Sequence, residues 1–510
     1  MTTRLRPAAA VVVGADAERH ETHGSIVRVA GDRAYKLRKA VRFPFLDQST
    51  PGAREALAHE EVRINQELAP GTYLGVRGMR ADADGAWHLD SEGAEVAWES
   101  EVVVEMRRFA EADTLAARVA AGRVEASDLA RLGALLARFH AGAAPIAGGG
   151  VRAALARVDR NLEDMAELDA DGLPRQRAWS LARPLAAFAL GHAESLEERA
   201  ARGCWRDGHG DLRADHVLVE SDGIRIVDRL EFDPALRADD VACDLAFLLS
   251  DLHARDAEWA ASEVLAAYRA AGGDAGEDGL LAFWMAYRAT VTAKVAVLRA
   301  RQAGTEAAAR TAAWRLAAAE RLVWRTRLPR VLVVCGPPAS GKSTLAAELH
   351  RRSGLSVLSS DVVRKRGRHL APTERAAAED YSVAASLAVY ERLGQRAASA
   401  VAFHGGVIVD ATMTSPALRA AFAEGLRTTA VPVTFVECRV PHDLAIARAR
   451  ARGNDPSAVS DATAAVTRRL RAAWSPPDEI APARHLTVRA DGDVSGVADD
   501  VERLLDEIGA

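Results

Sequence analysis

The order of hydrophobic and polar positions divides the chain into a strand-rich start, a long helical middle and an end in which strands and helices alternate. Apolar and polar residues alternate over 24–37 around the pair Gly31-Asp32, which predicts a β-hairpin. The segment 54–68, rich in Ala, Glu and Leu, predicts a helix that carries Glu61. Short apolar runs predict further strands at 8–14, 74–79, 86–89 and 102–106.

The helical middle contains one conspicuous polar insertion, the octapeptide HGDLRADH at 209–216. It leads into a predicted strand at 217–219, and a second short strand at 224–227 ends at Asp228. Because each of these two strands is flanked by an acid, we expect Asp211 and Asp228 to meet in one cleft.

The last part of the chain repeats a strand followed by a helix. The pattern from 282 to about 327 is almost continuously helical, and Leu328-Pro329 marks the expected boundary. Beyond it, apolar runs predict strands at 331–335, 356–358, 407–409, 433–436 and 486–488. Strands that alternate with helices in this way predict a parallel sheet with helices on both faces.

The first of these strands runs into GPPASGKST, which meets the G-x-x-x-x-G-K-[ST] pattern of a phosphate-binding loop. In such a loop, backbone N–H groups surround the β-phosphate, Lys342 reaches the β- and γ-phosphate oxygens, and the Ser343 hydroxyl binds magnesium. The alternative, a glycine-rich turn without a ligand, is disfavoured by the strand before the motif and the helix start after it. The residues predicted to bind ATP are Gly336, Pro337, Pro338, Ala339, Ser340, Gly341, Lys342, Ser343 and Thr344.

Lysine is scarce in this chain. There are 66 Lys and Arg residues among 510, yet lysine occurs only at positions 36, 39, 294, 342 and 365. Arginine therefore carries almost all general positive charge. Since lysine is a compact point charge that suits a phosphate, the remaining lysines are candidates for phosphate contacts.

The composition argues against two classes of protein, those that coat nucleic acids and those that are attached to membranes. The chain is 49% hydrophobic and 27% charged, with a formal net charge of -5, so it has no overall basic footprint for a nucleic acid. The apolar run at 8–14 is too short to span a membrane, and no membrane attachment is expected. The four cysteines form no C-x-x-C pair and are expected to be buried thiols in a reducing cytoplasm.

Acids also follow two strands of the predicted parallel sheet. Asp361 comes after the second strand and Asp410 directly after the third. Open α/β sheets bind ligands at the carboxyl ends of their strands. Asp361 is thus placed to deprotonate an acceptor hydroxyl, and Asp410 to hold or order magnesium.

The HGDL sequence and the strand that ends at Asp228 resemble the aminoglycoside phosphotransferase-like kinases, over about residues 20–300. The catalytic loop of that family reads H-G-D-L-H-x-x-N. The resemblance implies that Asp211 takes or orients the proton of the substrate hydroxyl and that Asp228 binds magnesium. It also implies that Lys36 holds the nucleotide phosphates, that Glu61 is its partner on a helix, and that the loop at Gly24 covers them.

The chain departs from this family at two positions near Asp211 and in the covering loop, which has a single Gly. His216 stands where the family has a metal-binding Asn, and Arg213 replaces the usual His. Since magnesium prefers oxygen ligands, either Asp215 substitutes, or the second metal position at His216 is weak, or the domain binds nucleotide without rapid turnover. Taken one at a time, Lys36 and Glu61 would also suit an ordinary strand and a solvated helix face.

The last part resembles the small P-loop kinases of the zeta-toxin and polynucleotide-kinase types, in which a D-x-x-R stretch follows the second strand. The resemblance implies that Arg364 binds substrate or phosphate. It also implies that Arg448 and Arg452, four residues apart on one helix face, belong to a lid that closes on the transferred phosphate. A solvated arginine face is the alternative, and it suits Arg450.

The predicted architecture is an α+β, protein-kinase-like bilobal domain at 1–325, with a small lobe at about 1–106, followed by an α/β P-loop domain at 330–510. The predicted function is an ATP- and Mg²⁺-dependent phosphotransferase acting on a hydroxyl of a small molecule. A nucleotide-sensing regulatory protein with a degenerate kinase-like domain is one alternative. A nucleic-acid end kinase is another, which the 5% aromatic content disfavours.

Overall fold

The computed structural model describes residues 11–22, 24–43, 46–91, 101–167, 175–327, 330–371, 374, 376–452 and 464–509. The chain forms two compact units: Met1–Ala153 with Glu194–Glu277, and Ala154–Ala193 with Asp278–Ala510. By their contacts, the helices at 278–327 therefore group with the phosphate-loop sheet. The linear division at about residue 325 stays a prediction about functional domains, and its expected marker, Leu328-Pro329, lies outside the described residues.

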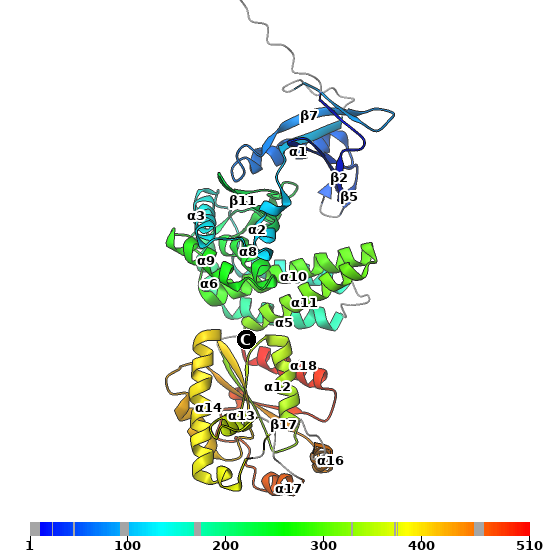
Figure 1. Ribbon diagram of the computed structural model, residues 1–510. Coiled ribbons are helices and arrows are strands. Elements are labelled where there is room, and N and C mark those ends of the chain that lie inside the picture. Colours follow the sequence, from blue (N-terminus) through cyan, green and yellow to red (C-terminus); the bar gives the residue numbers. More distant parts are fainter. Residues whose placement is uncertain are drawn as a thin grey trace, which may run out of the picture. The chain divides into compact units, whose positions relative to one another are not determined.

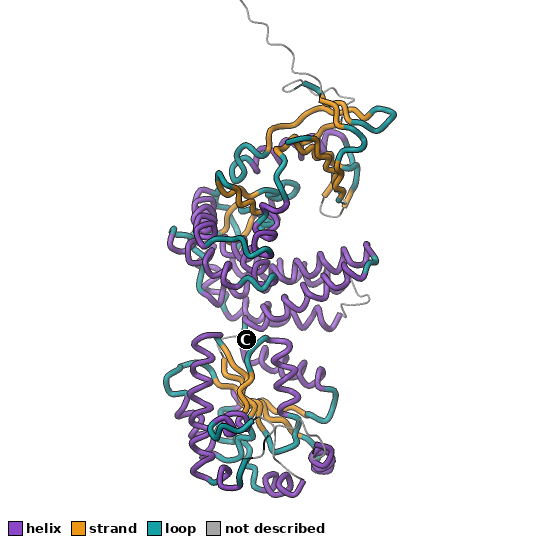
Figure 2. Tube along the Cα trace, in the orientation of Figure 1, coloured by secondary structure: helices purple, strands orange, loops and turns teal. Residues whose placement is uncertain are grey.

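The first unit begins with an antiparallel sheet (Figures 1 and 2). Its order is β1-β8-β7-β9-β4-β3-β2, and the predicted hairpin is formed by β3 (Ser25–Ala30) and β4 (Arg33–Arg38), which turn at Gly31 with φ 61°. The other strands of this sheet are β1 (Val11–Val13), β2 (Glu18–Glu21), β7 (Tyr73–Ala81), β8 (Trp87–Leu89) and β9 (Glu101–Arg107). A separate ribbon is formed by β5 (Arg42–Phe43) and β6 (Leu46–Asp47).

Helix α1 (Pro51–Asn65) packs against this sheet. It starts earlier than predicted, because the Thr50 side chain accepts the N–H of Ala53 and Pro51 fits the first turn. Ala58 of α1 shares a hydrophobic core with Tyr73 and Val104 of the sheet. This packing carries Glu61, on the same helix, into a position where it is 0% exposed.

The rest of the first unit is mainly helical, and the octapeptide 209–216 lies in its loop-rich part. That segment joins β10 (Trp205–Asp207) to β11 (Val217–Glu220) and ends in the single turn η2 (Ala214–His216). Strand β11 pairs with β12 (Gly223–Ile226), and these are the two short strands that the sequence predicted. The remaining elements are η1 (Glu111–Asp113), α2 (Leu115–Ala120), α3 (Ala126–Gly142), α6 (Ala193–Ala201), α7 (Pro234–Arg237), β13 (Ala238–Asp240), α8 (Val241–Ala254) and α9 (Glu258–Ala270).

The backbone of the octapeptide is fixed by one buried acid, Asp244 of α8. Its Oδ2 accepts the N–H of His209 at 2.8 Å, and its Oδ1 accepts the N–H of Gly210 at 2.9 Å. His140 of α3 lies 3.1 Å from the same carboxylate through Nε2. A carboxylate that accepts several hydrogen bonds strongly favours its charged form, and these partners outweigh the opposing effect of burial, so the pKa of Asp244 is lowered.

The second unit contains the predicted parallel sheet, in the order β15-β16-β14-β17-β18. Figure 1 shows α14 on one side of this sheet and α12 and α18 on the other. The strands are β14 (Arg330–Cys335), β15 (Val357–Ser359), β16 (Gly406–Asp410), β17 (Val433–Arg439) and β18 (His485–Arg489). The helices and turns of this part are α12 (Lys342–Ser353), α13 (Ser360–Arg366), η3 (Ala378–Tyr381), α14 (Val383–His404), α15 (Pro416–Gly425), α16 (His442–Arg452), α17 (Ala464–Ala472), η4 (Pro482–Arg484) and α18 (Val494–Gly509).

Alternate residues of β14 face two separate cores. Val331 and Val333 pack with α14 and α15 residues such as Leu393 and Phe422, whereas Leu332 and Val334 pack with α12 and α18. A strand covered on both faces reads as a continuous apolar run, which is the pattern seen in the sequence. The predicted fold class, a kinase-like α+β part and an α/β P-loop part, is confirmed.

Four helices complete the second unit: α4 (Gly150–Glu167), α5 (Arg175–Gly191), α10 (Asp278–Ala303) and α11 (Glu306–Arg325). The almost continuously helical pattern over 282–327 is divided between two helices at Gly304, whose φ of 62° ends α10, and Thr305 caps α11. By length and composition, α10 is the one helix among the described residues that could cross a membrane, and 72% of its apolar window is buried inside the fold. All four cysteines are buried thiols, as predicted, and none of them forms a disulfide.

The hydrogen bonds at Asp244 lead to a stability prediction. Asp244→Asn should lower the free energy of unfolding by about 3 kcal/mol, because it removes one partner of a buried charge-assisted network. Its amide would also place an NH2 group against one of the two backbone donors, the N–H groups of His209 and Gly210. Urea denaturation measures the change, with the exposed Asp84→Asn as the matched control. A loss no larger than that of the control would contradict the role given to Asp244.

Candidate functional site

The candidate site of the first unit centres on Lys36 in β4. Its Nζ donates to Glu61 Oε1 at 2.7 Å and lies 3.5 Å from Asp228 Oδ1. Burial works against a charged lysine, but the fields of Glu61 and Asp228 outweigh it and raise the pKa of Lys36. Lys36 is therefore held as a cation beside Asp228, and its contact with nucleotide phosphates stays a prediction.

Asp228 occupies a backbone conformation that is rare for non-glycine residues, with φ 64°. Its N–H donates to the Tyr73 hydroxyl at 3.0 Å, which fixes the peptide, and its side chain is 49% exposed. Burial among the surrounding groups would raise the pKa of Asp228, but Lys36 and His216 lower it well below its usual range. The result is an accessible, ionised carboxylate of the kind that binds magnesium.

Asp211 is held by a bidentate ion pair that the sequence did not predict. Arg213 donates to both carboxylate oxygens of Asp211, at 2.8 Å through Nε and 2.9 Å through Nη2. Burial raises the pKa of Asp211, while Arg213 and His216 lower it by more, so the net shift is downward. Asp211 is consequently an ionised hydrogen-bond acceptor. It is suited to orienting a hydroxyl once its ion pair with Arg213 breaks.

His216 joins the two acids. Its Nδ1 lies 2.8 Å from the backbone oxygen of Asp211, its Nε2 lies 3.0 Å from Nη2 of Arg213, and Nε2 is 3.5 Å from Asp228 Oδ2. Both ring nitrogens thus have a hydrogen-bond partner. A metal at His216 stays a prediction that would require the ring to give up its contact with Arg213. Within the described residues, no group of three or more His, Cys, Asp or Glu forms a ready metal cluster.

Two further charged residues of this cluster were not identified from the sequence. Arg38 follows Lys36 by two residues and so shares its face of β4, and it pairs with both Glu61 and Glu231. The period-two spacing from Lys36 was an available signal for Arg38. No comparable signal existed for Glu231.

The candidate site of the second unit is the loop between β14 and α12. Gly336, Ala339 and Gly341 have φ values of 131°, 64° and 91°, so this loop uses left-handed backbone at three places. A Cβ at Gly336 would lie 2.8 Å from the Cys438 carbonyl oxygen, which makes glycine necessary there. The buried Ser340 hydroxyl has no hydrogen-bond partner among the residues that the structure describes. A glycine cradle with an unsatisfied donor fits a phosphate group.

Lys342 and Ser343 lie at the start of α12, as the motif predicts. The Ser343 hydroxyl donates to Asp410 Oδ2 at 2.7 Å, so the predicted magnesium residues are adjacent and present oxygen ligands. Lys342 donates to the Pro337 carbonyl at 2.9 Å. Burial lowers the pKa of Lys342, and Asp410 offsets only part of that effect. An arriving phosphate would therefore favour the charged form of Lys342.

Asp361 and Arg364 lie in α13, beyond the second strand of the sheet. The Arg364 guanidinium is buried, donates to the Asp380 carbonyl and stacks 4.6 Å from the Tyr381 ring centre. Arg364 is thus held rigidly near Asp361. Binding of substrate by Arg364 stays a prediction.

A cluster of hydroxyl groups next to Asp361 was missed by the sequence reasoning. The Tyr390 hydroxyl lies 2.9 Å from Thr412 Oγ1, and Thr414 Oγ1 donates to Thr412 Oγ1 at 3.1 Å. Burial, with a further contribution from the Asp361 carboxylate, raises the pKa of Tyr390. The segment after Asp410 thus supplies neutral polar groups in addition to the acid that the sequence indicated.

Of the two arginines predicted to form a lid, the structure describes the side chain of one. Arg448 of α16 donates to the Ala490 carbonyl at 2.9 Å, and a Cβ on Gly341 would lie 3.4 Å from its Nη1. Arg448 therefore reaches the phosphate loop. The side chain of Arg452 lies outside the described residues.

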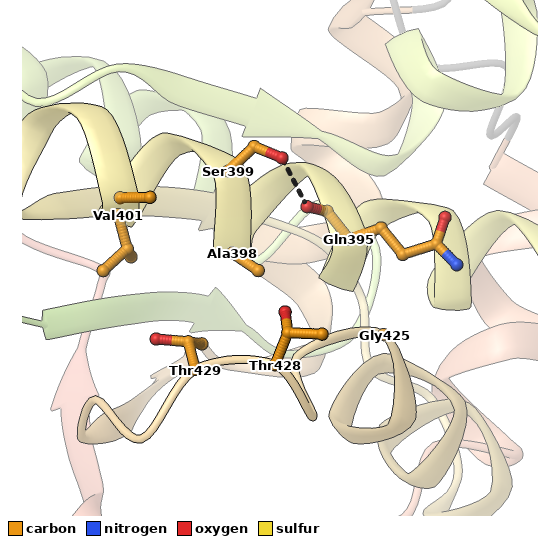
Figure 3. Close-up of a pocket in the computed structure, with 8 residues that line it drawn as sticks. Gln395, Ala398, Ser399, Val401, Gly425, Thr428 and Thr429 are labelled. Carbon is orange, nitrogen blue, oxygen red and sulfur yellow. Dashed lines mark hydrogen bonds between the residues drawn. The ribbon is translucent and has the colours of Figure 1, made fainter.

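A cavity of about 450 Å³ lies between α14 and the segment after α15, and it contains none of the predicted site residues. Figure 3 shows Gln395 and Ser399 on the α14 side and Thr428 and Thr429 opposite. This cavity therefore adds nothing to the chemistry of the phosphate loop.

The antiparallel sheet that carries Lys36 and the parallel sheet that carries the phosphate loop define the fold class: a kinase-like α+β part followed by an α/β P-loop part. A family model described as "AAA domain" matches residues 331–477. The chain is 32% identical over 462 residues to the uncharacterized proteins Rv2004c of Mycobacterium tuberculosis and Mb2027c of Mycobacterium bovis, with 89% of each chain covered. The chain belongs to the same family as these mycobacterial proteins.

Solved structures give more distant likenesses. A choline/ethanolamine kinase family protein from Mesorhizobium loti is 17% identical, with 61% of this chain and 88% of that chain covered and a TM-score of 0.38. The Mycobacterium tuberculosis APS kinase CysC, in complex with AMPPNP and APS, is 21% identical, with coverage of 35% and 98% and a TM-score of 0.26. At these TM-scores the likenesses carry no further argument.

The geometry at Lys342 leads to a binding prediction. Lys342→Ala should remove one ATP site, because it deletes the cation that bridges the β- and γ-phosphates, while the site at Lys36 is kept. Titration with a fluorescent ATP analogue should show the stoichiometry fall from two to one. Lys294→Ala, which changes a lysine paired with Asp164 at 2.6 Å, is the control. Unchanged stoichiometry in Lys342→Ala would overturn the assignment.

Proposed function

We propose that this protein is an ATP-dependent phosphotransferase that transfers a phosphoryl group to a hydroxyl of a small molecule. The observation that carries the proposal is the set at the phosphate loop: Ser343 and Asp410 in contact, Lys342 at the end of the loop, and a second acid, Asp361, on the neighbouring element. A nucleotide-binding site needs the first three groups. The additional acid is what an acceptor hydroxyl requires.

In the second unit, Lys342 and the loop N–H groups hold the triphosphate, and Ser343 and Asp410 hold magnesium. Bound magnesium neutralises charge on the phosphate oxygens. Asp361 orients the acceptor hydroxyl and accepts its proton late in the transfer, because the transition state is loose. Arg448, which lies beside Gly341, stabilises the transferring group, and Arg364 binds the acceptor.

In the first unit, Lys36 binds nucleotide phosphates, Glu61 orients Lys36, and Asp228 holds magnesium. Asp211 orients a second acceptor hydroxyl once its ion pair with Arg213 opens.

A metabolite-pool phosphorylation screen tests this function and assigns it to a domain. The wild-type chain should phosphorylate at least one metabolite from ATP. Loss of that product in Asp361→Asn but not in Asp211→Asn would assign the chemistry to the P-loop domain, and the opposite result would assign it to the first unit. No ATP-dependent product with the wild-type chain would contradict the proposal.

The roles of the two acids in the second unit can be separated. Asp361→Asn should keep Mg·ATP affinity near wild type and slow transfer by about 10²- to 10⁴-fold, the usual cost of removing a general base. Asp410→Asn should instead weaken magnesium binding directly, since it removes the carboxylate next to Ser343. Single-turnover rates and Mg·ATP affinities measure both effects. The reverse pattern would sink these assignments.

One observation favours a second candidate function, nucleotide sensing by a kinase-like domain that turns over slowly. The Arg213 guanidinium occupies both oxygens of Asp211, so the candidate acceptor-orienting group is engaged. In this case Asp211→Asn would leave every product of the screen unchanged while ATP still binds at Lys36.

A further inference from the structure

A continuous chain of charges passes through the Lys36 site and ends on the loop of Asp228. Arg38 is 5% exposed, and its Nη2 donates to both Glu61 Oε2 and Glu231 Oε1. Glu61 also accepts from Lys36, which lies 3.5 Å from Asp228. Asp228 and Glu231 are three residues apart, so this chain of alternating charges begins and ends on the loop that carries the candidate magnesium ligand.

Arg38 has a third connection, toward the loop expected to cover the nucleotide. Its Nη1 lies 3.4 Å from Gln48 Oε1, and Gln48 Nε2 donates to the Gly24 carbonyl at 2.6 Å. Gln48 is fully buried. One guanidinium thus contacts helix α1 through Glu61, the magnesium loop through Glu231, and the covering loop through Gln48.

Electrostatics explains why a second cation is needed beside Lys36. In the proposed function, Lys36 also interacts with the nucleotide phosphates, so it compensates the charge of Glu61 less. Glu61 is 0% exposed. A buried carboxylate that loses its cation is strongly disfavoured. Arginine cannot be deprotonated in proteins, so Arg38 keeps Glu61 ionised and fixed whatever Lys36 contacts.

The local fold does not depend on Arg38 alone. Asn65 of α1 donates to the Arg229 carbonyl at 3.4 Å and accepts the Arg229 N–H at 2.8 Å, which ties helix α1 to the magnesium loop independently. Tyr73 holds the N–H of Asp228. Loss of Arg38 would therefore leave these elements attached while removing the charge that links Glu61 to Glu231.

We infer that Arg38 is a positioning residue of the first unit, which acts through Glu61 and Glu231 to place Lys36 and Asp228 around the phosphates and magnesium of the nucleotide. This inference rests on the proposed function insofar as the first unit binds Mg·ATP. Groups that orient a metal site from behind its ligands usually change metal affinity or activity by 10- to 100-fold when they are removed.

The experiment uses the full chain carrying Lys342→Ala, so that the first unit holds the only remaining predicted ATP site. A fluorescent ATP analogue is titrated with and without MgCl₂. Arg38→Met should weaken affinity with magnesium by about 10- to 100-fold, and by less without it. Glu231→Gln, which keeps an acceptor for Arg38 but removes the charge, should shift affinity in the same direction by a smaller factor.

Two further variants separate positioning from simple stabilisation. Arg38→Lys should restore only part of the magnesium-dependent affinity, because a point charge cannot bond both carboxylates as the guanidinium fork does. Arg33→Met, on the same strand and paired with Asp32 at 2.9 Å, is the matched control and should behave as its parent. Thermal unfolding of each variant reports stability separately.

The outcomes divide as follows. Arg38→Met and Glu231→Gln could lower only the melting temperature and bind Mg·ATP as Arg33→Met does. In that case Arg38 has a purely structural role, and the inference is overturned while the proposed function stands. If Arg38→Met does not fold, Glu231→Gln decides by the same criterion. If the Lys342→Ala chain binds no ATP at all, the proposed role of the first unit fails, and the inference fails with it.

Discussion

Charged groups held away from water must be compensated, and this constraint shapes both candidate sites. In the first unit, Glu61 is buried between two cations, Lys36 and Arg38. In the second, the buried Lys342 donates to a neutral carbonyl, and burial lowers its pKa. The first site is therefore balanced before any ligand arrives, whereas the second gains charge balance when an anion binds. The two candidate sites thus differ in how much of their charge balance the protein itself supplies.

In both candidate sites, hydrogen bonds to the backbone fix the loops that carry the acids. Asp244 binds the N–H groups just before Asp211, and the Tyr73 hydroxyl binds the N–H of Asp228. In the second unit, the buried Arg419 donates to the Met413 carbonyl at 2.8 Å and so holds the segment after Asp410. Preorganisation of this kind is what phosphoryl transfer requires, since its catalysis rests on positioning and electrostatics.

Local motifs made much of this structure predictable from the sequence. The phosphate loop, the hairpin with Lys36 and the strand ending near Asp228 each carry a short pattern whose physics is contained within a few residues. Element ends were missed by a few residues where a side-chain cap decides, as at Thr50, and the break at Gly304 was hidden in a helical pattern.

Long-range pairing was not predictable in the same way. Arg38 donates to Glu231, which lies 193 positions further along the chain, and the Tyr390 hydroxyl contacts the Thr412 hydroxyl 22 positions further along. No periodicity in the sequence predicts either contact. The grouping of the 278–327 helices with the parallel sheet is likewise a property of packing. A single sequence records which residues are apolar or charged, but it does not record which of many equivalent partners they choose.

The end of α11 shows what this packing means for dividing the chain. Trp324 lies in the same hydrophobic core as Leu345 and Leu349 of α12, and its indole N–H donates to Glu502 at 3.1 Å. Arg327 makes a bidentate ion pair with Asp506 of α18, at 2.7 and 3.1 Å. A fragment cut at residue 330, although it would contain the whole phosphate loop, would expose the apolar surface that Trp324 covers and would leave Asp506 without Arg327, while Glu502 would keep its pair with Arg352 at 3.1 Å. The smallest autonomous P-loop piece of this protein accordingly begins upstream of its own motif, within the preceding helix.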